Sequence, residues 1–332
     1  MKKVFLLLLI AIFSSCSGQQ PKINGVSFVG SPKEISPDAI DPVVQVNANW
    51  AAVMPFGFLR NLETPTVVFN IERQWWGERR DGAKRTIELL NEKGIKVMLK
   101  PQIWVWRGEF TGNIKMNSEE QWKQLEKSYR EFIMLYAQLA KEMKVPILCI
   151  GTELHTFAQT RPTYWSELIK EIRTIYKGKL TYAENWDQIA KVPFWKQLDY
   201  IGVDAYFPVS ESKTPTVEEL RAGWQKHKTN IVKLKDTVDK PVLFTEYGYR
   251  SVHYTGKEPW DSTVVEGNFN FEAQNNALTA LYQEFWDEPW FAGGFIWKWF
   301  HNHNEVGGKV NNQFTIQNKP SEKIIKEFYS IH

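Results

Sequence analysis

The chain has very little cysteine: Cys16 and Cys149 are the only two in 332 residues. Cys16 lies in an N-terminal segment treated below as a leader, so no intramolecular disulfide is expected in the remainder of the chain. Cys149 lies in the apolar run Pro146–Ile150, which is typical of a buried strand. We interpret it as a packed core thiol and not as a nucleophile.

Long hydrophobic runs and an excess of one charge are also missing. The apolar run from Val4 to Phe13 is too short to span a bilayer. Lys and Arg total 41 against 38 Asp and Glu, so the chain has no electrostatic reason to bind nucleic acid. With 43% hydrophobic and 24% charged residues, the composition is that of an ordinary globular protein and excludes collagens, disordered chains and multispan membrane proteins.

Several cofactor and nucleophile motifs are absent. The sequence contains no Gly-x-Gly-x-x-Gly and no phosphate-binding loop, and residues 25–29 lack the second glycine of a nucleophile elbow. His301 and His303 are two residues apart on a loop, which is a poor zinc-binding spacing. We therefore expect neither a metal ion nor an organic cofactor.

The N-terminal sequence predicts an export signal. Two lysines precede the apolar run, and Ser14, Ser15 and Cys16 follow it, as in a bacterial lipoprotein signal; an ordinary secretory signal is the alternative. We expect a signal peptide over 1–15, a lipid-anchor linker over 16–21 and one domain over 22–332. Acylated Cys16 would anchor the protein to a membrane of the cell envelope, in a Gram-negative bacterium, at the outer membrane or the periplasmic face.

Short apolar runs alternate with long amphipathic ones along the rest of the chain. Eight runs flanked by turn residues are predicted as strands buried on both faces. They are Ile23–Val29, Trp50–Met54, Lys96–Gln102, Ile147–Glu153, Leu180–Asn185, Tyr200–Tyr206, Val242–Glu246 and Gly294–Trp299.

Helices are predicted between these strands. Capping boxes begin at Ser118 and Thr216, and glycines stand near the expected helix ends at 94 and 178. The predicted helices cover 80–93, 118–144, 163–176, 269–286 and 321–329, with another starting at 216, while the segment between the first two strands fits least well. This α/β pattern predicts a single-domain (β/α)8 TIM barrel, with a doubly wound sheet as the alternative.

Two strands end in a glutamate. Glu153 closes the fourth strand and Glu246 the seventh, and in a (β/α)8 barrel the chemistry occurs at the carboxyl ends of the strands. Either glutamate alone is explained equally well by a structural ion pair. The chain also carries 15 Trp, which suggests flat surfaces for a flat ligand, although burial in the core is the usual explanation of any single Trp.

Around these glutamates the sequence resembles clan A glycoside hydrolases, and within that clan family 113, the endo-β-mannanase family. The resemblance covers residues 22–330. It is carried by Lys96–Ile103, Ile150–Leu154, Asp199–Pro208 and Phe244–Gly248.

The resemblance implies a retaining glycoside hydrolase acting on β-1,4-mannosidic bonds in mannan or manno-oligosaccharides. Glu153 would be the acid/base and Glu246 the nucleophile, with a hydrogen bond from Tyr206 to the nucleophile. Two departures concern the subsite. Thr152 stands where many clan members have Asn, so the sugar 2-hydroxyl needs another partner, and Gln102 stands where related chains often have His.

Further residues are expected to bind the substrate because they end or follow strands. Trp297 is the expected floor under the reacting sugar, with Trp299 second. The remaining candidates are Trp104, Gln102, Lys100, Asn185, Trp186 and Asn49.

Other functions remain open from the sequence. One is an exo-β-mannosidase or a clan A enzyme acting on another β-glycan. Another is a glycan-binding lipoprotein without catalysis, although a binder gains nothing from two nearby carboxylates that repel each other.

The lipid anchor gives a direct prediction. Changing Cys16 to Ala removes the only acceptor for the acyl chains, so the protein should leave the membrane fraction or stay unprocessed. Fractionation of cells expressing either chain, followed by immunoblotting, measures this. Unchanged membrane association with normal processing would exclude the anchor.

Overall fold

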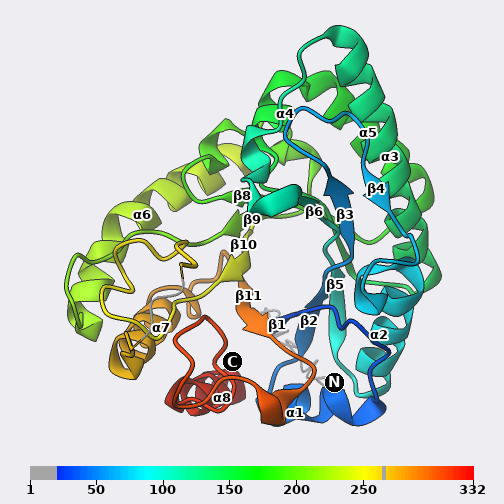
Figure 1. The fold of residues 1–332 in the computed structure, drawn as a ribbon. Coiled ribbons are helices and arrows are strands. Elements are labelled where there is room, and N and C mark those ends of the chain that lie inside the picture. The colour runs from blue at the N-terminus through cyan, green and yellow to red at the C-terminus, as the bar shows by residue number, and fades with distance from the viewer. Residues whose placement is uncertain (1–20, 264–266) are drawn as a thin grey trace, which may run out of the picture.

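The computed structural model describes residues 21–263 and 267–332, and it forms a closed barrel surrounded by helices (Figure 1). The signal peptide expected over 1–15, Cys16 and most of the linker lie outside the described residues. Eight strands close the barrel in the order β1-β11-β10-β9-β8-β7-β5-β2, and each neighbouring pair is parallel. The predicted (β/α)8 barrel is confirmed, and the doubly wound alternative is wrong because the sheet has no open edge.

All eight predicted strands are present. Their bounds are β1 Ile23–Phe28, β2 Trp50–Val53, β5 Lys96–Leu99, β7 Ile147–Thr152, β8 Lys179–Asn185, β9 Ile201–Asp204, β10 Val242–Tyr247 and β11 Phe291–Trp299. Because every strand is parallel and buried on both faces, all eight carboxyl ends meet at one end of the barrel.

A second, three-stranded sheet was not predicted. It consists of β3 (Phe56–Leu59), β4 (Val68–Phe69) and β6 (Gln102–Val105), in the order β4-β3-β6. β3 and β6 continue β2 and β5 beyond the barrel, each after a proline, Pro55 or Pro101. Proline has no N–H for the ladder, so the predicted strand 96–102 divides there into two pieces.

The helices form the outer layer (Figure 1). Their bounds are α1 Asp41–Gln45, α2 Arg80–Glu92, α3 Glu119–Glu142, α4 His155–Thr160, α5 Pro162–Ile175, α6 Val217–Val238, α7 Phe271–Phe285 and α8 Pro320–Ile331. The predicted caps are present: Ser118 Oγ accepts the Gln121 N–H and Thr216 Oγ1 accepts the Glu219 N–H. The segment between β1 and β2 forms only a 3-10 turn and the short α1, as its poor match indicated.

Two apolar layers hold the barrel together. The interior contains Ile23, Ala52, Met98, Ile147, Cys149, Ala183, Leu243 and Phe295. A larger cluster fills the space between the strands and the helices. Cys149 is fully buried, which agrees with a packed thiol. None of the helices in the described part of the chain is long and apolar enough to cross a bilayer.

Candidate active site

Glu246 lies at the carboxyl end of β10 and is held by three donors. Lys100 Nζ is 2.5 Å from Glu246 Oε1, and Gln102 Nε2 donates to the same oxygen at 3.0 Å. Tyr206 Oη donates to the other oxygen, Oε2, at 2.9 Å, which is the hydrogen bond expected from the sequence. Donors on both oxygens orient the carboxyl group and stabilise its anionic form.

Lys100 also bonds a second carboxylate. Its Nζ lies 3.2 Å from Asp204 Oδ1, and that oxygen accepts a 2.7 Å hydrogen bond from Thr245 Oγ1. Burial lowers the pKa of Lys100, but the charges of Asp204 and Glu246 outweigh burial and raise that pKa. Lys100 has no exposed surface, so the expectation that it binds a substrate hydroxyl is not met. Its place makes it the counter-ion of two acidic groups.

Glu153 follows β7, and its surroundings differ from those of Glu246. Among the residues that the structure describes, its carboxylate has no hydrogen-bond or ion-pair partner. Burial raises the pKa of Glu153 well above its ordinary value, the charges of Asp204 and Glu246 add to the shift, and Lys100 opposes it. A carboxyl group in this setting keeps its proton near neutral pH.

Irregular strand pairing occurs beside both glutamates. The register between β10 and β9 shifts between Phe244 and Glu246, and the register between β7 and β8 shifts between Cys149 and Thr152. Such irregularities bend a strand locally and change the direction of the next side chain. Here they occur where the barrel strands reach the site.

Two expected substrate contacts lie elsewhere. Asn49 precedes β2 at the amino end of the barrel, where it accepts the Asn24 N–H at 2.8 Å and donates to the Lys22 carbonyl at 3.0 Å. Trp299 has 0% exposed surface and belongs to the layer between barrel and helices. Neither side chain is available to a sugar in this arrangement. The sequence placed both residues on or beside strands, but it did not show at which end of the barrel Asn49 lies or which face of β11 carries Trp299.

Several aromatic residues do lie at the carboxyl end. Trp297 is partly exposed near the end of β11, next to the strand that carries Glu246. Trp104, on β6, is 49% exposed. Trp186 follows β8 directly and stacks on the exposed Trp260 with ring centroids 5.5 Å apart. Asn185 lies beside Trp186, and its Oδ1 accepts the Trp186 N–H at 2.9 Å.

The sequence interpretation missed Trp260 and Lys298. Trp260 comes from a loop after β10 with no strand or helix signal. Lys298 Nζ lies 5.4 Å from the centre of the Trp297 ring and 5.3 Å from that of Phe300. Burial lowers the pKa of Lys298, and Glu246 opposes that shift. Within 21–263 and 267–332, its ammonium group has no hydrogen-bond or ion-pair partner, so a cation without a protein acceptor lies near the nucleophile candidate.

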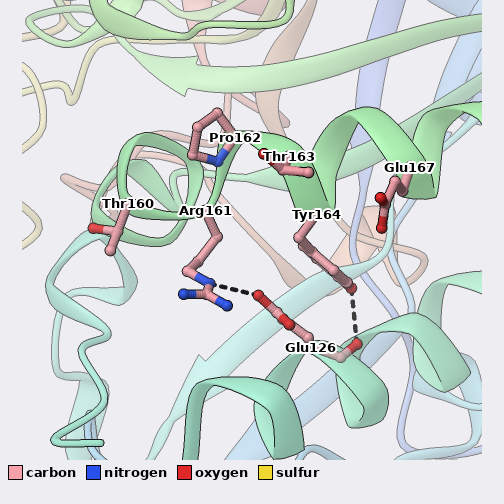
Figure 2. Close-up of a pocket in the computed structure, with 7 residues that line it drawn as sticks. All are labelled: Glu126, Thr160, Arg161, Pro162, Thr163, Tyr164 and Glu167. Carbon is pink, nitrogen blue, oxygen red and sulfur yellow. Dashed lines mark hydrogen bonds and ion pairs between the residues drawn. The ribbon is translucent and has the colours of Figure 1, made fainter. Parts of the chain in front are cut away.

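A separate surface pocket of about 270 Å³ lies at α3 and the start of α5 (Figure 2). Its arginine, Arg161, donates to Glu126 at 2.5 Å and to Glu119 at 2.7 Å, while Tyr164 Oη donates to the Glu126 carbonyl. The pocket therefore lies in the helical layer, its arginine is already paired with two glutamates, and it takes no part in the carboxylate cluster. The described residues contain no group of three or more His, Cys, Asp and Glu side chains arranged to hold a metal ion.

Comparison with solved structures gives the same architecture. A GH113 β-mannanase from Alicyclobacillus acidocaldarius superposes with a TM-score of 0.81 at 24% identity, over 94% of this chain and 98% of that one. A second GH113 β-1,4-mannanase gives 0.81 at 21% identity, over 94% and 100%. A β-glucuronidase from Faecalibacterium prausnitzii gives 0.62 at 15% identity and is covered over 49% of its length. A comparison with curated proteins found no match.

The sequence model described as Glycoside Hydrolase Family 113 matches residues 32–319, which is most of the chain and includes both glutamates. The family expected from the strand-end motifs is therefore confirmed. This chain belongs to Glycoside Hydrolase Family 113 and is a glycoside hydrolase.

Proposed function

We propose that this glycoside hydrolase cleaves β-1,4-mannosidic bonds in mannan or manno-oligosaccharides with retention of configuration. The mannan substrate is supported by the family and by the β-mannanases that share its fold. The observation that carries the mechanism is the unequal setting of the two glutamates. Glu246 accepts hydrogen bonds from Lys100, Gln102 and Tyr206, while burial keeps Glu153 protonated.

This difference assigns one role to each glutamate. The Glu246 carboxylate attacks the anomeric carbon as Glu153 gives its proton to the departing glycosidic oxygen, which forms a glycosyl-enzyme. The ionised Glu153 then takes a proton from water, and the water oxygen displaces Glu246 from the anomeric carbon. Lys100 neutralises part of the charge near Glu246, and Tyr206 and Gln102 hold the attacking oxygen atoms in place.

Binding of the glycan is assigned to the aromatic residues and Lys298. Trp297 is placed under the sugar next to the scissile bond, because it adjoins the strand of Glu246 and keeps part of its ring exposed. Sugar C–H groups pack on such a ring. Trp104 and the Trp186–Trp260 stack offer surfaces for sugar units of the glycan that lie farther from the scissile bond. Anchored through Cys16 in the cell envelope, the enzyme would act on glycans outside the cytoplasm.

Chemical rescue separates the roles of the glutamates. Glu153→Ala should still react with an activated aryl β-mannoside, because that leaving group needs no proton, and azide should then give a β-mannosyl azide. Glu246→Ala forms no glycosyl-enzyme, so azide should give the α-azide. NMR of the products measures both. Exchanged outcomes would reverse the roles, and an inverted sugar from the unaltered enzyme would exclude retention.

The pH profile tests the electrostatic argument. Since Glu153 must be protonated to act as an acid, kcat/KM should fall as pH rises through its elevated pKa. Burial is the largest cause of that elevation and the Asp204 charge comes next. Asp204→Asn removes this charge and leaves the burial, so the alkaline limb should move to lower pH.

Asp199→Asn is the matched control for the pH profile. Asp199 is bound to Arg173 and to the Leu180 N–H near the amino end of β8, away from Glu153. This substitution should leave the alkaline limb in place. If the alkaline limb stays in place in Asp204→Asn, or moves equally in both variants, that limb does not report the pKa of Glu153.

A panel of β-glycans tests the substrate. Mannan and manno-oligosaccharides should be cleaved faster than xylan or cellulose, with Glu246→Ala as the inactive control. Chromatography that detects mixed oligosaccharides supports endo action, whereas mannose alone supports exo action. Preference for another β-glycan would reject the mannan proposal.

The sugar contact assigned to Trp297 is tested separately. Trp297→Ala should lower kcat/KM on the best substrate roughly tenfold or more through lost ring contact.

A further inference from the structure

The backbone of Glu153 adopts an unfavourable conformation. Its φ is +51°, in the left-handed region that side chains other than glycine rarely occupy. Leu154, the next residue, is the N-cap of α4, and no side-chain hydrogen bond caps that helix. Such a backbone persists only where its surroundings hold it. The contacts of the peptide groups around Glu153 therefore decide where its carboxyl group lies.

Three hydrogen bonds hold these peptide groups. The Glu153 N–H donates to the Ala183 carbonyl at 2.8 Å, and the Glu153 carbonyl accepts from Thr111 Oγ1 at 3.2 Å. The Leu154 N–H donates to Tyr182 Oη at 2.8 Å. Only this third bond depends on a fully buried side chain, because Tyr182 has 0% exposed surface.

Tyr182 is held in turn by a buried carboxyl group. Its hydroxyl donates to Glu184 Oε2 at 3.3 Å, and Glu184 Oε1 accepts the Asn185 N–H at 2.9 Å. Glu184 also has no exposed surface. Burial raises the pKa of Glu184 to about 8, opposed first by the hydrogen bond from the Asn185 N–H. A buried carboxyl group is costly, and no step of the proposed reaction uses this one.

Tyr182 and Glu184 lie two residues apart on β8, on the strand face that points away from the barrel interior. Ala183, between them, belongs to the interior cluster, whereas Tyr182 packs on Trp165 of α5 and on Phe194. Neither side chain can touch the substrate from that face. Their hydrogen bonds reach the site through the backbone that follows Glu153, and the charge of Glu184 is the last of the causes that shift the pKa of Glu153, which it raises.

We propose that Tyr182 and Glu184 are positioning residues for the acid/base, because they form a buried chain that fixes the peptide between Glu153 and Leu154. This inference rests on the proposed role of Glu153. Loss of the chain should impair proton donation and leave the attack by Glu246 intact. The effect should therefore depend on how much the leaving group needs a proton.

The central test is Tyr182→Phe, which keeps the ring and removes the acceptor of the Leu154 N–H. We expect kcat/KM to fall roughly tenfold to hundredfold on a manno-oligosaccharide, and less than about threefold on a dinitrophenyl β-mannobioside. Tyr176→Phe is the matched control. Tyr176 is also buried and donates to the Val145 carbonyl at 2.8 Å, ahead of β7 at the amino end of the barrel. Tyr176→Phe should lower Tm about as much as Tyr182→Phe does, and it should change kcat/KM on the two substrates by the same factor.

Two substitutions of Glu184 complete the design. Glu184→Gln keeps an acceptor for the Tyr182 hydroxyl. It should preserve the ratio of kcat/KM on the manno-oligosaccharide to kcat/KM on the dinitrophenyl β-mannobioside. Glu184→Ala should lower that ratio as Tyr182→Phe does, and it serves as the test if Tyr182→Phe does not fold. Equal losses on both substrates, or no loss, would overturn the positioning role.

Glu153→Ala distinguishes this failure from failure of the proposed function. If Glu153→Ala is itself selective for the activated substrate while Tyr182→Phe and Glu184→Ala are not, the positioning role alone is wrong. If Glu153→Ala shows no such selectivity, the assignment of Glu153 as the acid is wrong, and the positioning inference is overturned with it.

Discussion

The site depends on the ion pairs that the Lys100 ammonium group forms with Asp204 and Glu246. This ammonium group lies fully buried at the carboxyl end of β5, between Asp204 at the end of β9 and Glu246 on β10. Two carboxylates this close would repel each other without a shared cation. Removing one member of such a buried group generally costs about 3–5 kcal/mol, because the remaining charge loses its partner. One lysine thus joins strands that are distant in sequence.

The same arrangement makes the two glutamates different. Glu246 is surrounded by donors, whereas Glu153 is partly buried without one and feels the charges of Asp204 and Glu246. Identical side chains therefore lie in different surroundings, and burial raises the pKa of Glu153. The proposed double displacement uses this difference, with Glu246 as the nucleophile and Glu153 as the acid.

The unpredicted sheet also contributes to the site. Pro101 ends the β5 ladder, and β6 begins at Gln102, which reaches Glu246 Oε1. Pairing with β3 holds β6 in register above the barrel, since Gln102 pairs with Phe56. Two residues farther along β6, Trp104 is exposed. One short strand of this sheet thus carries both a contact to Glu246 and an exposed aromatic ring.

The sequence alone determined the alternation of strands and helices, the two strand-end glutamates and the family. These follow from local periodicity and from short motifs, which do not depend on distant contacts. Tertiary structure decided the rest. Closing the barrel buried Lys100 between carboxylates, placed Trp299 in the helical layer and put Asn49 at the opposite end. The burial and partners of a side chain depend on strands far away in sequence, so no local pattern contains them.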